Sequence, residues 1–165
     1  MQRPETRTSA LSKMLTRDTI ALGVSVRDWQ QAVREAGKLL VRSGAVERRY
    51  VEAMIQMVKE IGPYIVIAPG VALPHARPED GVKRPCMSLV TLDPPVSFGN
   101  EHNDPVTLVV AFGTPDKEGH IEALTELARL LGDAEALARM KGASSTEELL
   151  LLVHGARGQG QPHSP

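Results

Sequence analysis

Four short apolar runs in the middle of the chain place the strongest constraint on its fold. These runs are rich in Val, Ile and Leu, are bounded by Pro, Gly, Asn and Asp, and cover residues 64–68, 71–73, 87–92 and 106–112. Runs of this length and composition predict β-strands. Because the runs contain few polar positions, we expect a sheet that is covered on both faces.

Helical patterns precede and follow the predicted strands. Ser25 and Asp28 form a capping signal for a helix whose apolar stripe continues to Leu40 and which Gly44 ends. A second amphipathic helix begins near Glu47. After the strands, helices are predicted over 120–131, 133–140 and 145–153. This order favours an α/β domain, a three-layer sandwich with a central sheet flanked by helices.

The length and the two ends of the chain bound its domain organisation. A chain of 165 residues suits a single domain that buries its own core. Residues 1–12 are polar, and residues 155–165 are rich in Gly, Pro and polar side chains, so neither end buries much apolar surface. We therefore expect one domain at 13–154 between disordered segments at 1–12 and 155–165.

Charge and cysteine content exclude several classes of protein. With 19 Lys+Arg against 20 Asp+Glu, the chain has no overall basic field to hold nucleic acid or an anionic membrane surface. Its one cysteine, Cys86, forms no intrachain disulfide, which favours a reducing compartment. The longest late apolar run, 149–153, is far shorter than the roughly 20 residues that span a bilayer. We expect a cytoplasmic protein without direct membrane insertion.

A single histidine follows the second predicted strand between two prolines. Proline fixes its own φ and favours an extended conformation in the preceding residue, so Leu73-Pro74-His75 and Arg77-Pro78 leave the backbone around His75 little freedom. The sequence therefore predicts an imidazole that is held in one direction. The alternative for an isolated histidine is an ordinary surface turn.

Further motifs follow His75 in a fixed order. After Pro-His-Ala-Arg-Pro at 74–78 come Pro-Val-Ser-Phe-Gly at 95–99, Asn-Asp-Pro-Val at 103–106, and Gly119-His120-Ile121 with Leu124 at the start of a predicted helix. This series, over about residues 15–153, resembles the enzyme IIA domains of the mannitol/fructose type in the bacterial sugar phosphotransferase system, and within them the ascorbate-type branch. The resemblance implies the mannitol-type enzyme IIA fold with a mixed central sheet.

The resemblance also implies a function. The histidine that matches His75 accepts a phosphoryl group from the phosphocarrier protein HPr and passes it to a cysteine of an enzyme IIB partner, which serves a membrane permease. The chain would then be a phosphotransferase without a bound cofactor, for ascorbate-like carbohydrate. A second histidine, matching His120, lies beside the first. Neutral imidazole is nucleophilic near neutral pH, and a histidine at a helix start can stabilise an adjacent anion.

One position departs from the mannitol-type pattern. Those members carry an arginine on the helix before the active strand, and the matching residue here is Met57. A neutral thioether cannot stabilise phosphoryl charge. Arg77 is the candidate for the compensating charge, with a solvated surface arginine as the alternative.

The other polar residues near these motifs are weaker candidates. His102 lies in a loop with turn-forming neighbours, and Cys86 lacks the setting that activates a thiol, so a buried strand residue is the better interpretation. Four carboxylates in nearby loops could face a basic carrier or be solvated: Glu79, Asp80, Asp116 and Glu118.

Two alternatives to sugar transport stay open at this point. In a regulatory module, phosphorylation of His75 would control another protein, and the sequence alone does not separate this from transport. A metal-dependent hydrolase would need His75, His102, His120 and Asp116 as ligands. The spacing argues against it, because no single element presents two ligands one helical turn apart.

Overall fold

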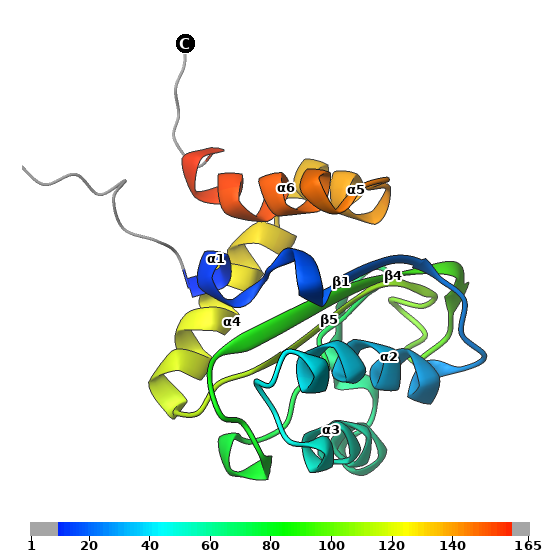
Figure 1. Ribbon diagram of the computed structural model, residues 1–165. Coiled ribbons are helices and arrows are strands. Elements are labelled where there is room, and N and C mark those ends of the chain that lie inside the picture. Colours follow the sequence, from blue (N-terminus) through cyan, green and yellow to red (C-terminus); the bar gives the residue numbers. More distant parts are fainter. Residues whose placement is uncertain (1–9, 160–165) are drawn as a thin grey trace, which may run out of the picture.

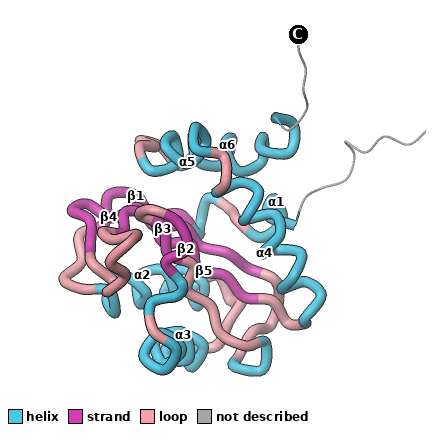
Figure 2. Tube along the Cα trace, turned by 180° about the vertical axis from the view of Figure 1, so that it is seen from behind, coloured by secondary structure: helices cyan, strands magenta, loops and turns pink. Residues whose placement is uncertain are grey.

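The computed structural model describes residues 10–159 and places a five-stranded mixed sheet at the centre of the fold. The strand order is β1-β4-β5-β3-β2, with bounds Ile20–Val24 (β1), Val66–Ala68 (β2), Val71–Ala72 (β3), Cys86–Val96 (β4) and Val106–Gly113 (β5). The pairs β1/β4 and β3/β5 are parallel, whereas β4/β5 and β2/β3 are antiparallel. Figure 2 shows β2 and β3 at the side of β5.

Helices cover both faces of the sheet and make three layers (Figure 1). On one face lie α2 (Trp29–Arg42) and α3 (Arg48–Ile61); on the other lie α1 (Ala10–Met14), α4 (Lys117–Leu131), α5 (Ala134–Lys141) and α6 (Thr146–Gln159). Short 3-10 turns connect the elements: η2 (Arg17–Thr19), η3 (Pro63–Ile65) and η4 (Pro78–Asp80). The predicted three-layer α/β sandwich is confirmed.

The apolar strands supply two separate cores. In β5, Leu108, Val110 and Phe112 pack with the α4 layer, while Val109 and Ala111 pack with the α2 and α3 layer. Successive side chains of a strand point to opposite faces, so a strand between two helical layers must be apolar at nearly every position. This arrangement explains why the sequence shows a continuous apolar run instead of an alternating one.

Helices α2 and α4 begin at side-chain caps, in part at positions other than those predicted. Asp28, and not Ser25, is the cap of α2, where its carboxylate accepts the Gln31 N–H at 2.9 Å. Helix α4 starts three residues before His120, because the Asp116 carboxylate accepts the Gly119 N–H at 2.6 Å. The prediction that His120 opens this helix was wrong, since its own N–H already donates to the Asp116 carbonyl.

Three segments differ from the expected boundaries. Strand β1 was not predicted, and residues 64–65 lie in the η3 turn instead of a strand. Residues 10–12 belong to α1 with Leu11 buried, and α6 extends to Gln159, so both ends of the described chain carry helix where disorder was expected. The rest of those terminal segments, 1–9 and 160–165, lies outside the described residues.

Candidate active site

The topology brings the two motif histidines to the same edge of the sheet. Strands β3 and β5 are parallel neighbours, with Ala72 opposite Val109, so their carboxyl ends lie side by side. His75 follows β3, and the loop after β5 leads directly into α4 and His120. Continuing the register by three residues places His75 beside Phe112, whose N–H donates to the Pro74 carbonyl at 3.2 Å.

The rings of His75, His120 and Phe112 form a compact triangle. The ring centroids are 5.4 Å apart for the two histidines, 5.0 Å for His75 and Phe112, and 5.3 Å for Phe112 and His120. Phe112 is fully buried, whereas both histidines are partly exposed. Phe112 therefore forms an apolar floor on which two imidazoles lie within reach of solvent.

A backbone contact sets the protonation of the His75 ring. Its Nδ1 lies 2.8 Å from the Leu73 carbonyl oxygen, which can only accept a hydrogen bond. Nδ1 therefore carries the proton, and Nε2 keeps its lone pair. Burial lowers the pKa of His75, the bond to Leu73 opposes this, and the proximity of His120 lowers it further. The net downward shift keeps His75 neutral near neutral pH.

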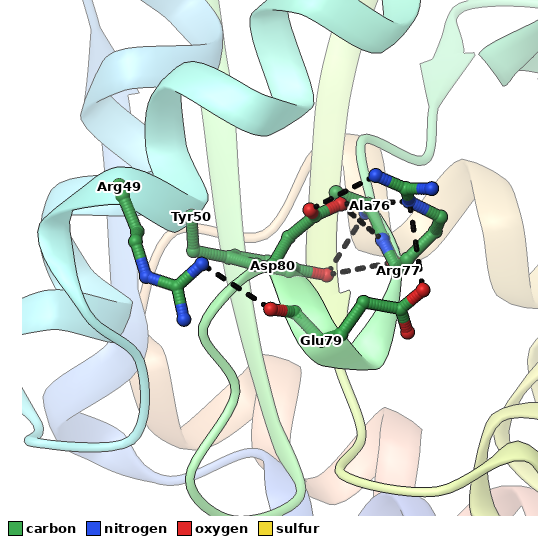
Figure 3. A network of polar contacts seen from close by, with 6 residues as sticks. All are labelled: Arg49, Tyr50, Ala76, Arg77, Glu79 and Asp80. Carbon is green, nitrogen blue, oxygen red and sulfur yellow. Dashed lines mark hydrogen bonds and ion pairs between the residues drawn. The ribbon is translucent and has the colours of Figure 1, made fainter.

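Tyr50, on α3, forms hydrogen bonds with the backbone of two segments of the site, the one that follows His75 and the end of β5. Its hydroxyl accepts the Ala76 N–H at 2.9 Å and lies 3.3 Å from the Ala76 carbonyl (Figure 3). The same hydroxyl donates to the Phe112 carbonyl at 2.8 Å. The side chain is fully buried, and burial raises the pKa of its hydroxyl, so the phenol stays protonated. In the sequence, Tyr50 lies on the apolar stripe of the second predicted helix, and its hydroxyl is the feature that distinguishes it from its apolar neighbours.

An open cleft of about 450 Å³ lies beside the two histidines. Residues from α3, the η4 turn and the start of α4 line it: Met57, His75, Ala76, Arg77, Pro78, Glu79, Pro115, Asp116, Lys117 and His120. Met57 is thus part of the site wall, where it brings no charge. Lys117 is a cation of this wall that the sequence did not single out.

Arg77 reaches the cleft but is held by carboxylates. Its Nε and one terminal nitrogen each lie 3.3 Å from the Asp80 carboxylate, and Nε lies 3.9 Å from Glu79 (Figure 3). Arg49 in turn donates to the Glu79 carbonyl at 3.2 Å and fixes the η4 turn to α3. The guanidinium of Arg77 is therefore already engaged by two acidic neighbours.

The remaining candidates lie apart from this site. His102 lines a different cleft with Gly70 and Lys141, at the opposite end of β3 from His75. The four proposed metal ligands are therefore not brought together, and residues 10–159 contain no group of three or more His, Cys, Asp or Glu side chains placed to hold a metal ion. In the same described part of the chain, no helix is long and apolar enough to cross a membrane.

Cys86 is a buried residue at the start of β4, as predicted. The residue is 3% exposed, and its thiol lies 3.7 Å from the Gly113 carbonyl. Burial raises the pKa of this thiol to about 12. The nucleophilic thiolate is therefore not formed near neutral pH.

Comparison with known proteins agrees with this arrangement. The chain matches the family described as "Phosphoenolpyruvate-dependent sugar phosphotransferase system, EIIA 2" over residues 13–155. It is 39% identical to the ascorbate-specific PTS system EIIA component of Escherichia coli K12, an alignment of 147 residues that covers 85% of this chain and 96% of the relative.

Two solved structures from Escherichia coli share the fold. One is the mannitol-specific cryptic phosphotransferase enzyme IIA CmtB, with a TM-score of 0.80 and 34% identity over 88% of this chain and 98% of that one. The other is enzyme IIAMtl in its complex with phosphorylated enzyme IIBMtl, with a TM-score of 0.77 and 31% identity over 86% of this chain and 97% of that one. The chain belongs to the type-2 EIIA family of the phosphoenolpyruvate-dependent sugar phosphotransferase system, and it is a phosphotransferase component of the mannitol-type fold.

Proposed function

We propose that His75 is the residue that carries the phosphoryl group, and that the chain accepts this group from phosphorylated HPr and passes it to a cysteine of an enzyme IIB protein. The observation that carries the proposal is the His75 ring itself, partly exposed, neutral, and bonded through Nδ1 to Leu73 so that Nε2 is free. Such a ring is a nucleophile that needs no activating base.

The transfer balances without a separate proton donor. The lone pair of His75 Nε2 attacks phosphorus and forms a new P–N bond, while the P–N bond of the donor breaks and its imidazole leaves with the bonding electrons. His75 keeps its Nδ1 proton on the Leu73 carbonyl throughout. In the second step a IIB thiolate attacks the same phosphorus, the P–S bond forms, and Nε2 recovers its lone pair.

His120 is the proposed partner of the phosphoryl group. Its ring lies 5.4 Å from that of His75, a separation that leaves room for a phosphoryl group bonded to one ring and hydrogen-bonded to the other. Preorganised donors aimed at developing charge are a main source of rate in such reactions. Arg77 is the second proposed source of positive charge, and for this role its guanidinium must leave Asp80 and Glu79.

The proposed partners are proteins, and the proposed compartment is the cytoplasm. A relative of known structure forms a complex with phosphorylated enzyme IIB, which supports a IIB acceptor here, and the ascorbate-specific relative supports an ascorbate-like carbohydrate. HPr as donor and a membrane permease beyond IIB complete the proposed pathway. These relatives support transport over a regulatory module.

The test is phosphorylation by phosphoenolpyruvate, enzyme I and HPr. We expect wild-type chain to gain one acid-labile, alkali-stable phosphoryl group and His75→Ala to gain none while remaining folded. His102→Ala is the matched control, because it removes an exposed histidine from the other cleft. Labelling of folded His75→Ala at the wild-type rate would remove His75 from the mechanism.

A further inference from the structure

The cleft beside His75 contains two side chains with a full positive charge, and they differ in what they contact. Arg77 is bound by Asp80 and Glu79. The side chain of Lys117, on the same cleft, forms no hydrogen bond or ion pair with any other residue in the described range 10–159. Its ammonium group is therefore the fully charged donor of this cleft that is available to a ligand.

The two carboxylates that line the cleft, Asp116 and Glu79, form no ion pair with Lys117. Asp116 uses its Oδ1 to cap α4 through the Gly119 N–H, and Glu79 lies 3.9 Å from Arg77. A phosphoryl group on His75 would bring two further negative charges into a cleft where one guanidinium is already neutralised. The unpaired side chain of Lys117 is the group that can stabilise these negative charges.

The position of Lys117 on α4 directs it toward the two histidines. Lys117 is the first residue of the helix, and His120 follows three residues later, so the two side chains are neighbours on one helix face. His120 is in turn 5.4 Å from the His75 ring, centroid to centroid. A lysine stem has four methylene groups, and its head is a mobile point charge with three donors.

Stability does not account for a lysine at this place. The amino end of a helix carries a partial positive charge, so a cation in the first turn is unfavourable. No ion pair within the described residues offsets this cost, although Glu118 follows directly in the chain. A residue that costs the fold stability while facing a phosphoryl site points to a functional use.

We propose that the Lys117 ammonium binds the oxygens of the phosphoryl group on His75 and supplies positive charge to the transition states of both transfer steps. This inference rests on the proposed function of His75. It assigns to the start of α4 the charge that Met57, which also lines the cleft, does not bring.

The test is single-turnover transfer from phosphorylated HPr to the full chain, measured by rapid quench over a range of HPr concentrations. Lys117→Met should lower the limiting rate by roughly 10-fold to 10²-fold, below the loss for a rigid donor because the lysine head is mobile and exposed. Lys117→Arg should keep most of the rate. Lys38→Met is the matched control, since it removes an exposed lysine of α2 that does not line the cleft.

Two further measurements separate phosphoryl binding from docking and from folding. The ³¹P resonance of the phosphorylated chain should shift in Lys117→Met and stay in place in Lys38→Met. The thermal midpoint of Lys117→Met should be equal to or above that of wild type, because an unfavourable charge has been removed from the helix start.

Several results would overturn the inference. An unchanged limiting rate in Lys117→Met would do so, as would a loss confined to the half-saturating HPr concentration, which would make Lys117 a docking residue. A similar loss in Lys38→Met would reduce the effect to general charge. If wild-type chain itself gains no phosphoryl group, the proposed function fails; if wild type is labelled normally and only the Lys117 effect is missing, this inference fails alone.

Discussion

Tyr50→Phe removes one oxygen atom from the core and leaves the backbone beside His75 without its partner. The ring and its packing are retained, so the change isolates the hydroxyl. The Ala76 N–H loses the acceptor at 2.9 Å, and the Phe112 carbonyl loses the donor at 2.8 Å. A buried donor left without a partner costs about 1–3 kcal/mol, so we expect the free energy of unfolding to fall by about 2 kcal/mol. For a domain of this size, that corresponds to a thermal midpoint lower by roughly 4–8 °C.

The chain supplies its own control for this prediction, because its only other tyrosine is Tyr64. That side chain is 75% exposed, against 0% for Tyr50, so Tyr64→Phe should change the free energy of unfolding by less than about 0.5 kcal/mol. Urea unfolding followed by circular dichroism gives both values, with an unchanged m-value as the sign that the denatured state is the same. Equal stability of Tyr50→Phe and Tyr64→Phe would refute the bracing role of the Tyr50 hydroxyl.

Two further predictions concern the histidines. His120→Ala should still accept phosphate on His75 but transfer it roughly 10²-fold to 10³-fold more slowly, and His120→Gln should recover part of the rate through its amide donor. Equal rates for wild type and His120→Ala in the rapid-quench assay would show that His120 takes no part in transfer. The pKa of His75 is lowered by burial below its ordinary 6.5, so between that pKa and 6.5 the unfolded chain binds the extra proton and stability rises with pH. Unfolding in urea at about pH 7.5 and about pH 5.5 should therefore show a smaller pH dependence in His75→Ala than in wild type, and a larger one would contradict the assignment.

The layers of the fold follow from patterns that survive locally in the sequence. The apolar runs of β4 and β5 and the stripes of α2 and α3 are long enough to be read without tertiary context, and they predicted the sandwich correctly. Strand β1 was missed because Gly23, at φ +64°, interrupts a short run, and its pairing with β4 shifts register at that point. Gly23 donates its N–H to Thr91 at 2.7 Å, a contact between distant residues that no local pattern reveals.

The site was predictable as a set of residues but not as an arrangement. The proline-flanked motif and the helix-start motif identified His75 and His120, yet their approach depends on the parallel pairing of β3 with β5, in which β3 contributes only Val71 and Ala72. Asp116 is a local signal for the start of α4, because an aspartate cap at this position predicts that Lys117 lies in the first turn of the helix. Tyr50 was hidden because its ring fits the apolar stripe and only its hydroxyl differs from the neighbours.

The arrangement of rigid and mobile groups suits a protein that must release what it accepts. Interactions that stabilise phosphorylated His75 as strongly as the transition state would not lower the barrier for transfer to enzyme IIB, and stronger binding of the phosphorylated intermediate would raise that barrier. The groups that hold the proposed nucleophile, His75, have fixed positions: the Leu73 carbonyl contacts Nδ1, the Phe112 ring lies beneath the imidazole, and the Tyr50 hydroxyl holds the adjacent backbone. The positively charged groups of the cleft are less rigidly placed, since the Arg77 guanidinium is bound by carboxylates and Lys117 lies exposed at a helix start. Fixed geometry with modest charge therefore favours passage of the phosphoryl group over its retention, which is the requirement on the proposed carrier.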